Sequence, residues 1–220
     1  PACGGTLKWL SISLVTPSKE SGWLKDFAQG LKLFTKTYQV PIIGGDLVKG
    51  KECSVSVGVC GEVTRKEFIS RDGAKVGDSI YISGVLGIAK LGLEVIQSKK
   101  KTFSPEEKKY VKKFLQPKVQ TTLGKNLRNI ASSCIDISDG LSADLNHVLK
   151  ASGVGAKVWN EKLPLAPSDH QHIEQIGDVF WPYSTGDDYE LCFTLPKKME
   201  VASLSHLTPF NISKIGVIEK

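Results

Sequence analysis

The sequence predicts an α/β (α+β) protein with two domains, residues 1–64 and residues 65–220. The first part of the chain shows strand-like and helix-like patterns in the order βαββ. The polar stretch Thr64-Arg65-Lys66-Glu67 separates this part from the rest, where short apolar strands again alternate with amphipathic helices. A chain of 220 residues with 40% hydrophobic content is long enough to bury the core of one large domain or two small ones.

The first domain starts with a half-buried strand at residues 10–14, where apolar and polar residues alternate. A helix follows, because aromatic and aliphatic residues recur at helical spacing from Trp23 to Phe34. We expect residues 41–43 to form a short buried strand that stops at the turn Gly44-Gly45-Asp46. Residues 54–63 alternate valines with small polar residues and predict the last strand of this domain.

The second domain starts with a strand at residues 79–83, and the next turn leads into a helix that extends through Ile96. Another helix is expected from Pro105, because Ser104 and Glu107 have the spacing of a capping box, and it ends before Pro117. The remaining pattern predicts further helices and the strands of a mixed sheet. The helices are expected at 118–130 and at 142–152 with Gly153 as its stop, and the strands at 134–137, 154–159, 189–195 and 212–218.

Composition restricts the class of partner and the location. The longest apolar runs are interrupted by Gly, Ser or Lys, so we expect neither a membrane-spanning helix nor a secretory signal, and no membrane partner. Five scattered cysteines without a Cys-x-x-Cys pair favour free thiols in a reducing cytoplasm. The net charge of +6 is concentrated in a lysine-rich segment at 99–118, which we interpret as a solvated helix face rather than a nucleic-acid surface. The positive charge favours polyanionic small ligands such as nucleotides.

The most informative motif is Cys134-Ile135-Asp136-Ile137-Ser138-Asp139-Gly140-Leu141, an apolar strand that ends in carboxylates just before a helix. Asp136 and Asp139 flank a short turn, so both are candidates to bind one Mg²⁺ ion, with Ser138 and the helix N-terminus as donors to phosphate. The alternative is that Asp139 is only the helix N-cap and that Asp136 closes an Asx turn. Two further acidic glycine segments, 43–46 and 184–191, strengthen the ligand-binding hypothesis.

Four segments in this order and spacing resemble the thiamine-monophosphate kinase family of the PurM-like (AIR synthetase-related) superfamily. They are Ile43-Gly44-Gly45-Asp46, Ser70-Arg71-Asp72-Gly73-Ala74-Lys75-Val76-Gly77-Asp78, Ile135-Asp136-Ile137-Ser138-Asp139-Gly140-Leu141 and Gly186-Asp187-Asp188-Tyr189-Glu190-Leu191-Cys192-Phe193. The resemblance implies a PurM-like two-domain architecture, with an N-terminal βαββ unit that binds ATP and dimerises and a C-terminal mixed-sheet α/β domain. The alternating strands of residues 1–64 also leave an apolar face that favours a homodimer.

The resemblance implies an enzyme of thiamine diphosphate biosynthesis that phosphorylates thiamine monophosphate with ATP. Mg²⁺ and a cationic side chain are needed because several negatively charged groups approach one another in this reaction. The resemblance assigns the roles as follows: Asp46, Asp136 and Asp139 bind Mg²⁺, Gly45, Asp46 and Ser138 contact nucleotide, Arg71 grips ATP phosphate, Tyr38 packs on adenine, and Asp187 binds substrate. For Tyr38, a core aromatic residue at the end of an amphipathic helix is the alternative.

The sequence also departs from the family pattern. Leu47 and Lys49 stand where the family usually has Thr and Arg, and Asp187 replaces a longer Glu. Other Asp-rich family motifs have no counterpart, so we expect a truncated form with little activity. The alternatives are another PurM-like ATP-dependent enzyme and a degenerate, non-catalytic nucleotide-binding module.

Overall fold

The computed structural model describes residues 1–17, 21–199 and 207–220. The chain divides into two compact units, a smaller one formed by Gly5–Val63 and a larger one formed by Pro1–Gly4 together with Thr64–Lys220. The N-terminal residues join the larger unit through Arg128, whose Nε donates to the Gly4 carbonyl at 2.7 Å. The candidate site residues are therefore divided between two separately packed units.

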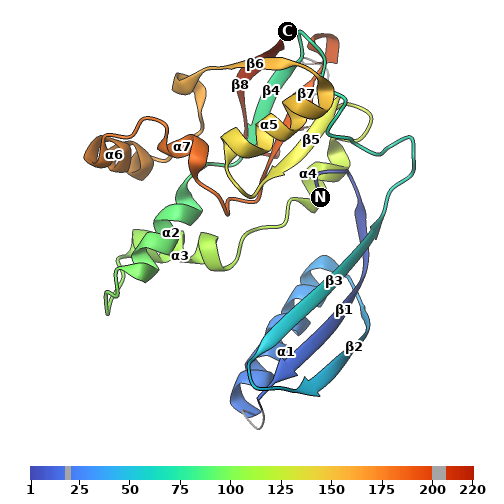
Figure 1. Ribbon diagram of the computed structural model, residues 1–220, viewed down its shortest axis with the longest axis vertical. Helices are drawn as coiled ribbons and strands as arrows, with labels where there is room; N and C mark the ends of the chain where they lie inside the picture. Colours follow the sequence, from blue (N-terminus) through green and yellow to red (C-terminus); the bar gives the residue numbers. More distant parts are fainter. Residues whose placement is uncertain (18–20, 200–206) are drawn as a thin grey trace. The chain divides into compact units, whose positions relative to one another are not determined.

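The smaller unit has the predicted βαββ order. Its elements are β1 (Thr6–Thr16), α1 (Ser21–Tyr38), β2 (Ile42–Lys49) and β3 (Ser54–Glu62). The strands form a mixed sheet in the order β2-β1-β3, in which β1 pairs parallel with β2 and antiparallel with β3 (Figure 1). Leu10 and Leu14 of the central strand are buried, whereas Val55, Val57 and Val59 on β3 are 39–60% exposed. The edge strand β3 therefore presents apolar side chains to solvent.

The Gly-Gly-Asp segment is not the turn that the sequence predicted. β2 runs through it from Ile42 to Lys49 as an edge strand paired with β1, and it is exposed along its whole length. Gly45 is in register with Ile12, and a Cβ on Gly45 would lie 1.8 Å from the Ile12 carbonyl oxygen. Only glycine permits this approach of the two backbones, so the segment continues as a strand.

The larger unit combines a sheet with helices on both faces. Its strands are β4 (Ser79–Ser83), β5 (Ser133–Ile137), β6 (Gly155–Val158), β7 (Glu190–Leu195) and β8 (Ile212–Glu219). Its α-helices are α2 (Ile88–Gln97), α3 (Pro105–Leu115), α4 (Thr121–Asn126), α5 (Leu141–Ser152), α6 (Pro167–Ile176) and α7 (Trp181–Ser184), and its 3-10 helices are η1 (Asn160–Lys162) and η2 (Lys197–Met199).

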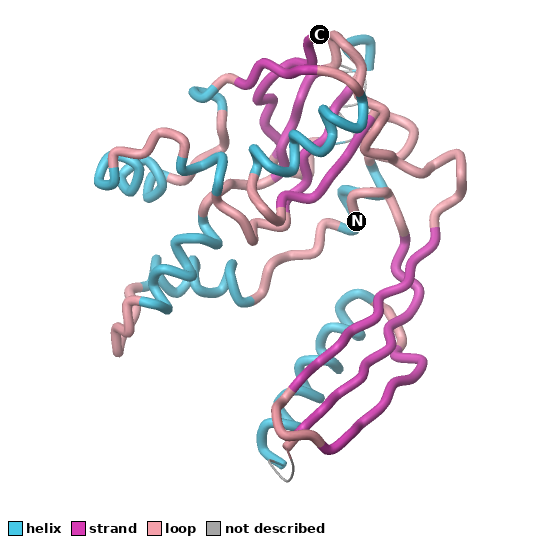
Figure 2. The backbone as a smooth tube through the Cα atoms, in the orientation of Figure 1, coloured by secondary structure: helices cyan, strands magenta, loops and turns pink. Residues whose placement is uncertain are grey.

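The sheet order is β5-β7-β4-β8-β6, and each of these pairings is antiparallel. The expected mixed pairing is thus found in the smaller unit rather than here. Helix α5 lies across one face of the sheet (Figure 2) and packs its apolar side against alternate strand residues such as Ile82 and Ile137. The strand residues between these, whose side chains lie on the opposite face of the sheet, include Tyr81 and Phe193. They pack with Leu123 of α4 in a second core. The sheet is therefore the middle layer of the unit.

Helix α2 begins at Ile88, directly after the predicted turn, in which Gly84 and Gly87 have positive φ angles of 67° and 86°. Other boundaries differ from the sequence prediction. The helix expected at 118–130 is reduced to α4, and Asn129 beyond it has a φ angle of 62°. The helices α6 and α7 were not predicted. In the described part of the chain, no helix combines the length and apolarity needed to cross a membrane.

Candidate functional site

The end of β5 and the start of β7 lie side by side at one edge of the sheet in the larger unit. The two strands pair antiparallel, with Ile137 in register with Glu190. Beyond the ladder, the Tyr189 N–H donates to the Ile137 carbonyl at 2.8 Å and the Asp187 N–H donates to the Ser138 carbonyl at 2.9 Å. The fold thus brings together two acidic segments that are about fifty residues apart in the sequence.

We define residues 136–140 and 186–190 as the acidic edge. Asp136 and Asp187 are half-buried there, and Asp139 is exposed. Within the described ranges, neither Asp136 nor Asp139 receives a hydrogen bond or forms an ion pair through its side chain. These two carboxylates therefore remain available to a cation, and cations such as Mg²⁺ prefer oxygen ligands.

Tyr189 also belongs to the acidic edge, although the sequence analysis assigned it no role. It is 41% exposed, and its hydroxyl donates to Asp187 Oδ1 at 3.3 Å. The pKa of Tyr189 is raised, first by partial burial and then by the charge of Asp187, with Asp136 and Asp139 acting in the same direction. Tyr189 thus contacts Asp187 directly, and its phenol lies within the electrostatic influence of Asp136 and Asp139.

Asp144 organises the first loop of the acidic edge, and the sequence analysis did not identify it. This residue of the first turn of α5 is 3% exposed, and its Oδ2 accepts the N–H groups of Ser138, Asp139 and Gly140 at 2.9, 3.0 and 3.1 Å. These three amides are thus engaged within the protein and are not free to donate to phosphate. The N-cap of α5 is Gly140 and has no side-chain hydrogen bond, so Asp139 is not the helix cap. An acidic residue in the first helical turn was the available sequence signal.

Arg71 lies away from the acidic edge. The carbonyl of Arg71 accepts the hydroxyl of Ser152 at 3.1 Å, and the neighbouring Ser70 carbonyl accepts the N–H of Cys134 at 3.2 Å. Ser152 is the last residue of α5 and Cys134 lies near the start of β5. The Arg71 backbone is therefore at the opposite ends of β5 and α5 from the acidic edge.

The other candidate residues belong to the smaller unit. Asp46 is exposed on β2, and its Oδ1 accepts the N–H of Leu47 at 2.8 Å. Gly45 precedes it at the close approach to β1. Tyr38 ends α1, and its ring lies 4.6 Å from that of Phe34, so it takes part in the packing of the helix. Tyr38, Gly45 and Asp46 are therefore candidate binding residues of the smaller unit.

The donor set of the acidic edge fits Mg²⁺ bound together with phosphate. Among the described residues, no three His, Cys, Asp or Glu side chains are grouped so as to hold a metal ion by themselves. Protein-bound Mg²⁺ commonly uses only one or two carboxylates, and substrate phosphates and water complete its octahedral shell. Asp136 and Asp139 are suited to that kind of site.

A hollow of about 540 Å³ adjoins Asp139 between α5, β6 and α7. Leu145, Leu149 and Val158 contribute apolar lining, and Tyr183 adds an aromatic ring. A concave apolar surface beside a few polar groups is typical of small-molecule sites. The larger unit thus offers room for a ring-bearing ligand next to its acidic edge.

Comparison with known proteins defines the class of this protein. The family described as "AIR synthase related protein, N-terminal domain" matches residues 1–63. The solved structure "AaThiL complexed with AMPPCP and TMP" superposes on the whole chain with a TM-score of 0.88 at 34% identity, and the chain covers 69% of it. The fold is therefore that of an AIR synthase-related α/β protein.

Two curated relatives define the family more closely. Thiamine-monophosphate kinase of Aquifex aeolicus (strain VF5) is 35% identical over 223 residues, covering 100% of this chain and 70% of the relative. Thiamine-monophosphate kinase of Escherichia coli (strain K12) is 36% identical over 215 residues, covering 95% of this chain and 66% of the relative. The chain belongs to the thiamine-monophosphate kinase family, and it spans about two thirds of the length of these relatives. The resemblance and the fold class predicted from the sequence are confirmed.

Proposed function

We propose that this protein transfers the γ-phosphoryl group of ATP to thiamine monophosphate, yielding thiamine diphosphate and ADP. A non-bridging oxygen of the acceptor phosphate bonds to the γ-phosphorus while the bond from that phosphorus to the β–γ bridging oxygen breaks. The side-by-side placement of the segments that carry Asp136, Asp139 and Asp187 is the observation that carries this proposal. Family membership and the relative whose structure contains AMPPCP and TMP support it.

Asp136 and Asp139 would hold Mg²⁺ at the acidic edge in this reaction, and Asp46 is proposed separately as a Mg²⁺ ligand on the smaller unit. Mg²⁺ supplies positive charge that offsets the repulsion among the phosphate groups. The three backbone hydrogen bonds that Asp144 accepts hold the loop of Asp139 in one conformation, so the chain contributes a preorganised carboxylate.

The remaining roles concern orientation of the two substrates. Asp187 would bind thiamine monophosphate, and the hollow beside Asp139 offers space for a heterocyclic ring. Gly45, the Ser138 hydroxyl and Tyr38 are proposed to contact the nucleotide. Arg71 is proposed to grip ATP phosphate, and because its backbone is remote from the acidic edge, its contribution requires a separate test.

We further propose a homodimer formed through residues 1–64, acting in the cytoplasm. The exposed valines of β3 support the dimer, because an exposed apolar edge strand is a surface on which a second chain can pair or pack.

The direct test is formation of thiamine diphosphate from thiamine monophosphate, ATP and Mg²⁺, measured by chromatography. Asp136→Asn should weaken Mg·ATP binding by about tenfold or more in calorimetric titration, because it removes a ligand charge at nearly constant volume. Asp26→Asn, an exposed substitution on α1, is the matched control and should bind as the parent does. Equal Mg·ATP affinity in the parent and Asp136→Asn would rule out the metal role of Asp136.

A further inference from the structure

The segment that carries Asp187 alternates between exposed and buried side chains. Within the acidic edge, Asp187 is half-buried and Tyr189 is exposed, whereas Asp188 and Glu190 are 0% and 4% exposed. Asp187 and Tyr189 also have left-handed φ angles of 63° and 50°. This conformation is unfavourable for residues other than glycine, so surrounding contacts must hold it.

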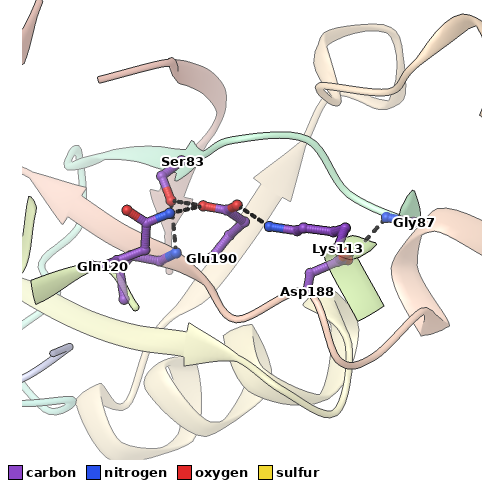
Figure 3. A network of polar contacts seen from close by, with 7 residues as sticks. Ser83, Gly87, Lys113, Gln120, Asp188 and Glu190 are labelled. Carbon is purple, nitrogen blue, oxygen red and sulfur yellow. Dashed lines mark hydrogen bonds and ion pairs between the residues drawn. The ribbon is translucent and has the colours of Figure 1, made fainter. Parts of the chain in front are cut away.

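Glu190 is held by side chains from three other parts of the chain (Figure 3). Lys113 Nζ donates to Oε1 at 2.5 Å, and Ser83 Oγ and Gln120 Nε2 donate to Oε2 at 2.6 and 2.7 Å. Gly84 makes room for the carboxylate, because a Cβ there would lie 2.3 Å from Glu190 Cδ. The start of β7 is thereby tied to β4, to α3 and to the residue before α4.

Asp188 ties the same segment to the start of α2 (Figure 3). Its Oδ2 accepts the Gly87 N–H at 2.9 Å, while its buried Oδ1 has no hydrogen-bond partner among the described residues. Gly87 is itself restricted, since its φ angle is 86° and a Cβ would lie 2.7 Å from the Trp181 ring. Asp188 therefore contacts a backbone position that has little freedom to move.

Stability alone does not account for these buried acids. A buried ion pair such as Lys113–Glu190 is often no more stabilising than well-packed apolar side chains, because both charges lose their hydration. We propose that Asp188 and Glu190 are positioning residues, whose buried contacts hold Asp187 and Tyr189 on the acidic edge in the conformation that binds the substrate. This inference rests on the proposed function of that edge.

The first test compares Asp188→Asn with Asp188→Ala. Asparagine retains a carbonyl oxygen that accepts the Gly87 N–H, whereas alanine removes the acceptor. We expect Asp188→Asn to keep a KM for thiamine monophosphate close to that of the parent. We expect Asp188→Ala to raise this KM by about tenfold or more, with a smaller change in the KM for ATP. A parent-like KM in Asp188→Ala, or equal KM values in the two variants, would overturn the role of Asp188.

The second test separates positioning from folding at Glu190. Lys113→Met should lower Tm because it leaves the Glu190 carboxylate buried without its cation, and the double variant Lys113→Met/Glu190→Met should recover part of the lost Tm, since Ser83 and Gln120 then lose their acceptor. The double variant should nevertheless keep a KM for thiamine monophosphate raised by about tenfold. Recovery of KM together with Tm would show a purely structural role. Lys112→Met removes an exposed lysine from the same helix and should leave Tm and KM unchanged.

Calorimetric binding of thiamine monophosphate distinguishes this inference from the proposed function. A parent that binds this molecule without phosphorylating it refutes the proposed kinase activity, and the Asp188 variants then test positioning through the dissociation constant. Binding equal in the parent and Asp188→Ala refutes positioning alone. A parent that neither binds nor phosphorylates thiamine monophosphate refutes both.

Discussion

Removal of the Asp144 side chain should destabilise the larger unit and loosen the first loop of the acidic edge. In Asp144→Ala the N–H groups of three consecutive residues lose their common acceptor. The amide of exposed Asp139 can bond to water, but Ser138 is half-buried and Gly140 is buried. A buried donor left unsatisfied costs about 1–3 kcal/mol, so we expect the free energy of unfolding to fall by about 2–4 kcal/mol.

Urea denaturation followed by circular dichroism measures this loss, and hydrogen exchange of the amides at 138–140 locates it. Asp144→Asn should lose less, because its carbonyl oxygen still accepts hydrogen bonds, although without the negative charge. Lys150→Ala, at an exposed position of the same helix, should change stability by no more than about 0.5 kcal/mol. The reasoning is refuted if Asp144→Ala matches that control in stability and its amides exchange as slowly as in the parent.

Three further predictions concern the close approach in the smaller unit, its assembly and the pH dependence of the larger unit. Gly45→Ala should destabilise the β1–β2 pairing by about 1–3 kcal/mol or more. Gly44→Ala should cost less, because a Cβ at Gly44 has no atom within 4 Å. Equal urea midpoints for the two alanine variants would contradict this prediction. Val57→Lys should shift the proposed dimer toward monomer in sedimentation equilibrium. Val179 is exposed on the larger unit, so Val179→Lys should leave the dimer unchanged. An unaltered dimer in Val57→Lys would place the interface elsewhere. Burial raises the pKa of Asp188 from 3.8 to about 7, so the folded state binds the proton more tightly and ionised Asp188 costs about 4 kcal/mol above pH 7. That cost disappears as pH falls from about 7 to 4, so the stability of Asp188→Asn relative to the parent should rise with pH across this window, and a flat difference would count against the burial argument.

Structural features that depend only on residues close together in the sequence were predictable from it. The capping box at the start of α3 forms as expected, with the Glu107 N–H donating to Ser104 Oγ at 3.1 Å and the Ser104 N–H donating to Glu107 Oε2 at 2.8 Å. Gly153 ends α5 with a φ angle of 66°. These features require contacts within one or two turns of chain, so the local pattern contains the necessary information.

The strand through Gly44-Gly45-Asp46 shows where local pattern was insufficient. Two glycines before an acid are typical of a turn, but pairing with β1 continues through Lys49. The hydrogen bonds of that pairing come from a strand about thirty residues earlier, so local propensity is overridden by a tertiary contact.

The acidic edge was likewise predictable from the sequence only in part. The sequence alone determined that Asp136 and Asp139 follow an apolar strand and that Asp187 lies in an acidic turn before another strand, so the first two are candidates for binding cations, and the family resemblance made Asp187 a candidate for binding substrate. Only the tertiary structure decided that they meet at one edge, that Asp144 occupies the neighbouring amides, and that Arg71 lies at the far ends of β5 and α5. It also decided that Glu190 is buried against Ser83, 107 positions away in the chain. Such contacts depend on strand order and packing, which join residues that no local period relates.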